Sequence, residues 1–395
     1  MRRAIELAKK GEGWCHPNPL VGAVIVKGGH VIGEGYHAKF GDLHAERNAI
    51  RSLSEPAEGA DLYVTLEPCC HYGKQPPCTE AIIENKIRRV IVGSRDPNPK
   101  VAGGGVKALR DAGIEVVEDF LKEECDELNP VFFHYIRTGT PYVVMKYAMT
   151  LDGKIATKTG ASRWITGPES LSYVHQMRNA LMGIMVGIGT VVADDPLLNC
   201  RMENGRSPVR IIADSSLNIP LKSRIAKTAG EYETIIACAL PFLPEGEILA
   251  GETPVSDPAA ARLRDLLDEG MRVVNVPLRG KELVHGSQNP GMHSENDQEE
   301  EIFRVDLKKL TAFLGREGID SILLEGGGTL NESAIRADIV NEVCAFIAPK
   351  VFGGPAPSPV QGIGIEKPDE SVRLTFREMK RLGDDVMLRY ILNRD

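Results

Sequence analysis

Strand-like and helix-like runs alternate from about residue 20 to residue 137. The apolar runs 21–27 and 31–37 predict two strands joined by a tight turn across Lys27-Gly28-Gly29-His30. Before them, Ala4, Ile5 and Ala8 share one side of a short amphipathic helix. After them, the pattern predicts helices at 44–53, 79–86 and 106–113, and strands at 62–68, 89–94 and 114–119. This alternation predicts an α/β sandwich.

A second pattern begins near Thr140 and supplies strands and helices of its own. A closing antiparallel hairpin is expected at 372–392, and the polar segment 278–301 is expected to be an exposed, partly disordered insertion. The strands are predicted at 141–153, 210–216, 234–240, 272–276, 321–328 and 341–353, and the helices at 168–180 and 306–318. We therefore expect two domains, 1–139 and 140–395.

Composition narrows the class of protein. A length of 395 residues suits two domains, and the net charge of −8 without a long basic stripe disfavours a nucleic-acid substrate. No apolar run is long enough to span a bilayer, and the first residues lack the apolar core of a signal peptide. The eight cysteines are then expected to be thiols or metal ligands in a reducing compartment. We expect a cytoplasmic enzyme with no membrane partner.

Four residues of the first domain form a candidate metal site. His44 and Glu46 stand at the predicted start of a helix, Cys69 follows a strand and a proline, and Cys78 enters the next helix. One imidazole and two thiolates fill three positions of a tetrahedral zinc ion and leave the fourth for water. Glu46 is then placed to carry a proton from that water to a leaving amine, which is the chemistry of a zinc deaminase.

Other readings of these residues stay open. Cys69 and Cys70 are also typical of small buried apolar side chains, and Cys70 is not expected to be a ligand. A purely structural zinc would need a fourth protein ligand, for which His71 is the candidate. The eight residues between Cys69 and Cys78 also depart from the spacing of two that is general among zinc deaminases.

Longer motifs resemble one family, the bifunctional riboflavin-biosynthesis deaminase/reductases. In the first domain the resemblance is carried by PNPLVGAVIV (17–26), GYHAKFGDLHAE (35–46) and TLEPCCHYGKQPPC (65–78), which includes the long spacing between the cysteines. In the second it continues through KYAMTLDGKIA (146–156), SRWITG (162–167), VGIGTVVADDPLLNCR (186–201) and LLEGGGTL (323–330). It covers nearly the whole chain apart from 278–301.

The resemblance implies two consecutive reactions. The first domain, with a cytidine-deaminase-like αβα fold, would remove an amino group from 2,5-diamino-6-ribosylamino-4(3H)-pyrimidinone 5′-phosphate. The second, with a dihydrofolate-reductase-like fold, would reduce the ribosyl chain to ribityl with NADPH. His44, Cys69 and Cys78 match the zinc ligands of the family, and Glu46 matches its proton shuttle. The positions that hold the base and phosphate are matched by Asn18, His37, His71 and Lys74.

Without the resemblance, the residues of the second domain give only a weak indication of its function. A G-x-G-x-x-G fingerprint is absent, but a strand runs into Gly326-Gly327-Gly328 and then a helix, a turn that presents backbone N–H groups to an anion. By resemblance, the cofactor would contact Ala148, Trp164, Thr166, Thr190, Asp194, Ser215, Gly327, Gly328, Thr329, Leu330, Asn331, Glu332 and Ser333. The substrate would contact Ser162, Arg178, Leu198, Arg201 and Glu325, with the arginines on its phosphate.

Three rival functions remain at this point. The first is a deaminase whose second domain binds a nucleotide without reducing anything. The second is a free-nucleoside or nucleic-acid deaminase with an unrelated partner domain, and the third is a zinc scaffold without activity. Asn199 stands where the family often has threonine, which affects the expected fit of the substrate. Members of the family tend to pair through the second domain, so a homodimer or higher homo-oligomer is expected.

Overall fold

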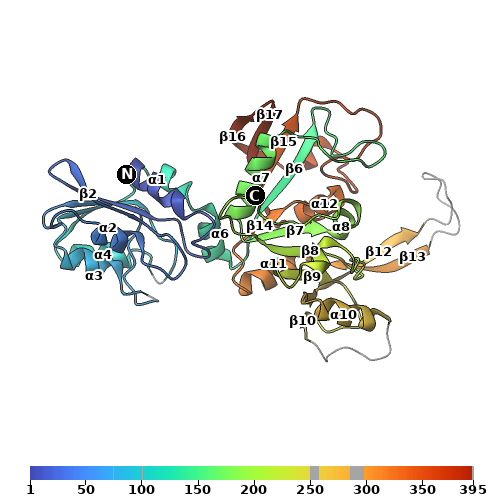
Figure 1. Cartoon of the computed structure of the whole chain (residues 1–395), viewed down its shortest axis with the longest axis horizontal. Coiled ribbons are helices and arrows are strands. Elements are labelled where there is room, and N and C mark those ends of the chain that lie inside the picture. The colour runs from blue at the N-terminus through green and yellow to red at the C-terminus, as the bar shows by residue number, and fades with distance from the viewer. Residues whose placement is uncertain (74, 100, 250–257, 285–297, 394–395) are drawn as a thin grey trace. The chain divides into compact units, whose positions relative to one another are not determined.

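The computed structural model describes residues 1–73, 75–99, 101–249, 258–284 and 298–393 (Figure 1). The chain forms two compact units, Met1–Tyr142 with Gly318–Asp320, and Val143–Glu317 with Ser321–Asp395. The division lies three residues after the boundary expected from the sequence, and a short piece of the later chain joins the first unit. Among the described helices, none is long and apolar enough to cross a membrane.

The first unit is built on a five-stranded mixed sheet in the order β2-β1-β3-β4-β5. β1 is antiparallel to β2 and β3, whereas β3, β4 and β5 run parallel. The turn between β1 and β2 contains Gly28 and Gly29, both with positive φ, as a tight hairpin requires. The strands are β1 (Gly22–Lys27), β2 (His30–Tyr36), β3 (Asp61–Leu66), β4 (Arg89–Ser94) and β5 (Glu115–Val117).

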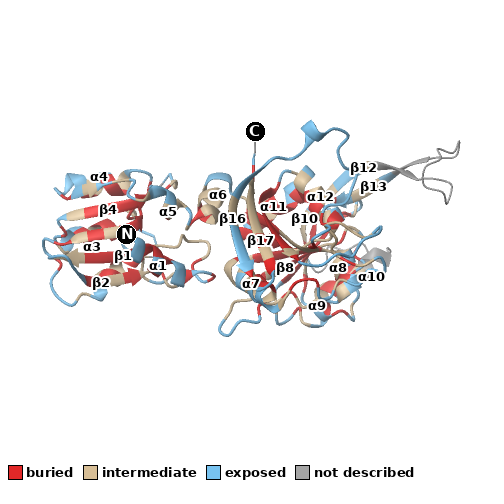
Figure 2. Cartoon of the chain, turned by 90° about the horizontal axis from the view of Figure 1, so that it is seen from above, coloured by how far each residue is buried: buried red, intermediate tan, exposed pale blue. Residues whose placement is uncertain are grey.

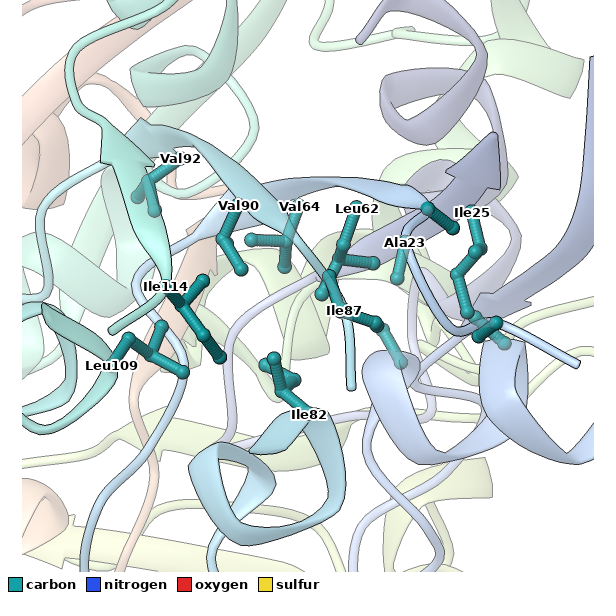
Figure 3. Packing of buried hydrophobic residues seen from close by; sticks show 14 of the residues in the cluster. Ala23, Ile25, Leu62, Val64, Ile82, Ile87, Val90, Val92, Leu109 and Ile114 are labelled. Carbon is teal, nitrogen blue, oxygen red and sulfur yellow. The ribbon is translucent and has the colours of Figure 1, made fainter. Parts of the chain in front are cut away.

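Helices cover both faces of this sheet. The main core lies between the sheet and α2, α3 and α4, and Figure 3 shows Ile82 and Leu109 of the helices facing Leu62, Val64 and Val90 of the strands. On the other face, Ala4 and Leu7 of α1 pack against Val24. The helices are α1 (Arg2–Ala8), followed by a 3₁₀ turn (Lys9–Gly11), α2 (Ala45–Arg51), α3 (Cys78–Glu84), α4 (Gly104–Asp111), α5 (Lys122–Asp126) and α6 (Pro130–Thr138). The unit is the αβα sandwich that the sequence predicts.

Two glycines set how closely the helices approach the sheet. A Cβ on Gly22 of β1 would lie 1.9 Å from the carbonyl oxygen of Ala4 in α1, and one on Gly35 of β2 would lie 2.3 Å from the backbone nitrogen of Ala49 in α2. Both distances are far below contact range, so only glycine lets the helix backbones lie this close. The position of α2 matters because Glu46 lies in its first turn and His44 directly precedes it.

The second unit contains a ten-stranded mixed sheet in the order β10-β11-β9-β8-β7-β14-β6-β15-β17-β16. β11, β9, β8, β7 and β14 form a parallel run, and the hairpin β16–β17 closes the other end by pairing β17 antiparallel to β15. The strands are β6 (Tyr142–Thr150), β7 (Gly183–Gly187), β8 (Val209–Ala213), β9 (Thr234–Cys238), β10 (Gly246–Ile248), β11 (Arg272–Asn275), β14 (Ser321–Leu324), β15 (Val340–Ala348), β16 (Leu374–Leu382) and β17 (Asp385–Leu392).

In Figure 2 the central strands of this unit are mostly red, whereas β16 at the edge of the sheet is mostly exposed and the helices carry both buried and exposed residues. All four residues of β14 are buried, as expected of a strand with elements on both faces. The helices are α7 (Pro168–Ala180), α8 (Ile188–Asp194), α9 (Arg224–Lys227), α10 (Pro258–Asp268), α11 (Leu307–Arg316) and α12 (Gly328–Arg336), with a 3₁₀ turn at Pro368–Glu370.

The expected insertion at 278–301 requires a correction. β12 (Pro277–Val284) and β13 (Gln298–Val305) pair antiparallel, from Pro277 opposite Val305 to Val284 opposite Gln298. Figure 1 shows this two-stranded ribbon projecting away from the ten-stranded sheet. The expectation of partial disorder is therefore wrong for both flanks of the segment, which are paired strands. Their sequences are rich in polar residues and lack the regular alternation that normally marks a strand. Residues 285–297 lie outside the described part of the chain.

Candidate active sites

The start of α2 positions two of the predicted metal-site residues. His44 precedes the helix in an extended conformation (φ −70°, ψ 163°), and Glu46 lies in the first turn. Glu46 is only 3% exposed, so its carboxyl group is held inside the unit rather than in solvent. Burial raises the pKa of Glu46, and the neighbouring Cys69 thiolate raises it further. A carboxyl group whose pKa lies closer to neutrality is better suited to accept and return a proton.

Cys69 and Cys78 converge on the same imidazole. Cys69 follows β3, Cys78 opens α3, and their Sγ atoms lie 3.5 Å and 3.4 Å from His44 Nδ1. The three ligand atoms all lie within 4.8 Å of one another. A tetrahedral zinc with bonds of about 2.3 Å to sulfur and 2.0–2.1 Å to nitrogen places sulfur and nitrogen about 3.5 Å apart. The donor set and its spacing therefore fit zinc with one open position.

The pKa values of the two thiols are shifted in opposite directions. A hydrogen bond from Cys78 lowers the pKa of Cys69 to about 4, and Cys69 also accepts the Cys78 backbone N–H at 3.3 Å. The same thiol-to-thiol hydrogen bond and burial raise the pKa of Cys78. The hydrogen bond with Cys69 raises the pKa of His44. One thiolate is thus already stabilised at this point, as a metal ligand requires.

A cavity of about 250 Å³ opens beside these residues and is lined by His44, Glu46 and Cys69. Asn18, His37 and His71, which the sequence assigns to substrate binding, line the same cavity. Lys74, assigned with them, lies outside the described residues. His71 is not in the ligand group formed by the described residues, and its Nδ1 is buried without a hydrogen-bond partner. His71 therefore lies on the cavity wall, outside the group formed by His44, Cys69 and Cys78.

His37 is held as a neutral imidazole. Burial lowers the pKa of His37, and its Nδ1 lies 3.2 Å from the Leu43 carbonyl oxygen, which can only accept a hydrogen bond. The proton therefore sits on Nδ1, and Nε2 accepts from the Asn18 side-chain amide at 3.2 Å. This chain of bonds orients Asn18 at the cavity wall.

The structure adds wall residues that sequence reasoning missed, notably Glu67, Asp96 and Asn98. Glu67 is buried and accepts the backbone N–H groups of Gly103, Gly105 and Val106 at 3.0–3.1 Å. These hydrogen bonds fix the first turn of α4. Burial raises the pKa of Asp96 to about 6. The motif DPNP at 96–99 was visible in the sequence, but nothing in it indicated that β4 delivers it to this cavity.

The second unit contains a larger cavity, of about 940 Å³, which suits a dinucleotide together with a substrate. It opens where the parallel strands end, the usual place for a ligand in an α/β sheet. Its wall includes all the residues assigned to the cofactor except Glu332, namely Ala148, Trp164, Thr166, Thr190, Asp194, Ser215, Gly327, Gly328, Thr329, Leu330, Asn331 and Ser333. Asn331 is fully buried and its Oδ1 has no partner, so an acceptor is presented for a bound molecule.

Two residues assigned to the reductase substrate, Ser162 and Glu325, line this cavity. Glu325 forms a bidentate ion pair with Arg178, whose Nε and Nη2 each donate to one carboxylate oxygen at 2.9 Å. Lys146 Nζ lies 3.9 Å from Oε2 of the same carboxylate. Burial alone would raise the pKa of Glu325, but the charges of Arg178 and Lys146 outweigh it and lower the pKa to about 2. Lys146, a wall residue, was not singled out from the sequence.

Four assigned residues lie outside the cavity wall. Arg178 is committed to Glu325 and to the Asn199 carbonyl at 3.1 Å, which departs from the expected role as a free phosphate ligand. Glu332 pairs with Arg336, one turn further along α12. Leu198 is buried, and Arg201 is exposed, with its backbone N–H donating to His175.

Comparisons with known proteins match both units. The family described as "Cytidine and deoxycytidylate deaminase zinc-binding region" matches residues 1–94, and "RibD C-terminal domain" matches 141–244 and 264–388. The "Riboflavin biosynthesis protein RibD" of Actinobacillus pleuropneumoniae is 48% identical over 99% of this chain and 94% of its own length, and that of Escherichia coli is 34% identical over 99% and 98%.

Solved structures agree with this result over the whole chain. RibD of Acinetobacter baumannii has a TM-score of 0.80 at 32% identity, covering 100% of this chain and 98% of its own. A Thermotoga maritima protein described as a diaminohydroxyphosphoribosylaminopyrimidine deaminase/5-amino-6-(5-phosphoribosylamino)uracil reductase has a TM-score of 0.79 at 34% identity, covering 100% and 97%. Both halves are matched, which favours the bifunctional reading over a deaminase alone. The chain belongs to the RibD family of bifunctional riboflavin-biosynthesis enzymes, with a zinc-type deaminase unit followed by a reductase unit that uses NADPH.

Proposed function

We propose that the first unit hydrolytically deaminates 2,5-diamino-6-ribosylamino-4(3H)-pyrimidinone 5′-phosphate and that the second unit reduces the ribosyl group of the product to ribityl. The observation that carries the first half is the convergence of His44, Cys69 and Cys78 beside the buried Glu46. The substrate follows the name of the Thermotoga maritima relative, which is 34% identical over the whole chain. The cavity beside Glu46, about 250 Å³, is of a size for one pyrimidine ring.

In the proposed deamination, His44, Cys69 and Cys78 hold zinc, which when bound activates water for attack on the ring carbon that bears the amino group. The Glu46 carboxylate accepts a proton from that water and delivers it to the adjacent ring nitrogen. It then carries the remaining hydroxyl proton to the amino nitrogen, so that the carbon–nitrogen bond breaks, ammonia leaves and a carbonyl remains. Asn18, oriented by His37, and His71 hold the base and the phosphate. The buried position of Glu46 keeps bulk water from competing for its proton.

In the proposed reduction, NADPH when bound would supply the hydride to the first carbon of the sugar, the bond from that carbon to the ring oxygen would break, and the oxygen would take up a proton from solvent. The glycine-rich start of α12 and the buried Asn331 hold the cofactor, while Ser162 and Glu325 face the substrate. Arg178 fixes Glu325 in its ionised form, and it acts on the substrate through that carboxylate. The polar end of the cavity thus carries one buried carboxylate flanked by two cations.

We propose a small-molecule substrate rather than a nucleic acid, because the chain has a net charge of −8. A cytoplasmic location is proposed because none of the eight cysteines forms a disulfide. For the assembly we propose a homodimer through the second unit. There β16 is the last strand of the ten-stranded sheet, and its Phe376 and Met379 are 57% and 67% exposed.

The test is a two-stage assay on the purified chain. With the diaminopyrimidine phosphate alone, ammonia should be released in a zinc-dependent manner; on adding NADPH, nicotinamide absorbance should then decay in proportion to the deaminated product. Ammonia release without any later decay would mean that the second unit only binds nucleotide. Turnover of cytidine or single-stranded DNA in place of the pyrimidine would contradict the proposed substrate.

A further inference from the structure

The segment that carries Asn18 has little regular structure of its own. Residues 12–21, which precede β1, form neither helix nor strand. Asn18 stands between Pro17 and Pro19, which have no backbone N–H to donate. The Asn18 N–H donates to the Cys15 carbonyl oxygen at 2.8 Å and closes a short turn. The position of this turn therefore depends on contacts with other parts of the chain.

On one side of Asn18, the side chain of Asn129 holds the backbone of Leu20. The Leu20 N–H donates to Asn129 Oδ1 at 2.8 Å, and Asn129 Nδ2 donates to the Leu20 carbonyl oxygen at 2.9 Å. Asn129 immediately precedes α6 and is 3% exposed. An asparagine at this position usually accepts a hydrogen bond from the first turn of its own helix, whereas the Asn129 amide is committed to a residue 109 positions earlier.

On the other side of Asn18, the His16 imidazole contacts Asp320. His16 Nδ1 lies 2.6 Å from Asp320 Oδ2, and because a carboxylate oxygen can only accept, Nδ1 donates this hydrogen bond. Asp320 is 1% exposed and is one of the three residues, Gly318–Asp320, by which the later chain joins the first unit. Its backbone carbonyl accepts the Tyr142 N–H at 2.7 Å. The turn is thus held two residues before Asn18 and two residues after it.

These contacts bear on substrate binding because Asn18 lines the deaminase cavity. Pro19 belongs to the same wall, together with Phe132 of α6, the helix that Asn129 precedes. The Asn18 side-chain nitrogen donates to His37 Nε2, which sets the orientation of the amide. A hydrogen bond between Asn18 and a base needs a separation of about 2.7–3.2 Å, so a shift of about 1 Å in the Asn18 backbone would break it.

We propose that Asn129 and Asp320 are positioning residues of the deaminase, which hold Asn18 where its side chain meets the pyrimidine. The inference rests on the proposed deaminase function and extends it to two residues beyond the deaminase match, which ends at residue 94. Asp320 lies inside the range matched by the RibD C-terminal domain. Substrate binding by the first unit therefore depends on parts of the chain that come long after the zinc ligands.

The first test is steady-state ammonia release by the full chain and by its variants Asn129→Ala and Asp320→Ala. A hydrogen bond from Asn18 made equally with substrate and transition state affects KM and not kcat, so KM should rise roughly two- to tenfold at unchanged kcat. Asp320→Asn keeps a hydrogen-bond acceptor in the same place and should recover most of the effect. Asn85→Ala is the matched control, because it removes an amide-to-backbone hydrogen bond of 2.8 Å at the end of α3, outside the described cavity wall.

A double-mutant cycle separates positioning from a general loss of stability. Asn18→Ala removes the side chain through which both residues are proposed to act. Adding Asn129→Ala or Asp320→Ala to it should therefore raise KM by less than about twofold more. Effects that multiply in the double variants would show that the two residues act on something other than Asn18 and would overturn the inference. A KM unchanged in both single variants would overturn it as well.

Hydrogen exchange gives a readout that does not need turnover. The Leu20 amide donates to Asn129, so in Asn129→Ala the amide protons of residues 15–21 should exchange about tenfold faster, while those of β3 keep their rates. Unchanged exchange in 15–21 would refute the positioning role and leave the proposed deamination standing. An unmodified chain that releases no ammonia from the diaminopyrimidine phosphate would instead contradict the proposed function, so the two failures are distinguishable.

Discussion

Replacing Glu46 by glutamine isolates the proton-transfer step of the deaminase. Glutamine has the shape of glutamate, and the site is 3% exposed, so the change removes a charge and a titratable proton without opening a cavity. The buried carboxylate is costly to keep ionised, as its raised pKa shows, and the neutral amide removes that cost. The fold and the three metal ligands should therefore be retained.

The expected effect on catalysis follows from the role alone. Loss of a positioned general acid–base reduces a rate by about 10²- to 10⁴-fold, which corresponds to about 2.7 to 5.4 kcal/mol of transition-state stabilisation. The rate of ammonia release from the diaminopyrimidine phosphate should therefore be lower in Glu46→Gln by a factor of about 10² or more. Zinc measured by mass spectrometry should stay at one ion per chain.

The second unit provides an internal control. NADPH oxidation with the deaminated substrate should be unchanged in Glu46→Gln, because the reductase cavity is lined by residues of the second unit. A variant that releases ammonia within tenfold of the unmodified rate would refute the shuttle role. A variant that loses zinc would instead place Glu46 among the groups that hold the metal.

Three further predictions follow from single side chains. Cys78→Ala should abolish zinc binding and ammonia release while NADPH oxidation on the deaminated substrate persists; retained zinc by mass spectrometry would contradict its role as a ligand. Ile82→Ala, in the core of Figure 3, should cost about 2–5 kcal/mol in denaturant unfolding of the first unit, whereas the neighbouring, 38% exposed Ile83→Ala should change it by less than about 0.5 kcal/mol. Because the folded-state pKa of Glu325 is depressed to about 2, its stabilising contribution is present above the unfolded pKa and is lost as the pH falls towards 2. The stability difference between the unmodified chain and Glu325→Gln should thus be constant above about pH 5 and shrink below it; a difference that does not depend on pH would show that Glu325 is not ionised by its neighbours.

The strands and helices with clear periodicity were predictable from the sequence. The helix predicted at 168–180 is α7 with the same bounds, and the expected closing hairpin is β16–β17. β7 was missed although it lies inside the ten-stranded sheet, because four of its five residues are buried and so short a run gives neither alternation nor helical spacing. The ribbon β12–β13 was missed for the opposite reason, since its strands are polar.

The metal cluster was predictable because its residues occupy element boundaries, at the start of α2, after β3 and at the start of α3. Other residues of the two sites could not be predicted in this way, because they are brought together only by the pairing of strands and by contacts between distant parts of the chain. Asp96 follows β4 and reaches the deaminase cavity only because β4 lies parallel to β3. Likewise, the pairing of Arg178 with Glu325 joins residues 147 positions apart, and no local pattern indicates that one neutralises the other.

X-ray absorption at the zinc edge tests the central claim most directly, because it counts the atoms around the metal in the full chain. The account predicts one zinc with two sulfur ligands at about 2.3 Å, one imidazole nitrogen at about 2.0–2.1 Å and one further light atom from solvent. A second imidazole in the fourth position would instead indicate a closed structural site, and a chain purified without stoichiometric zinc would contradict the account altogether.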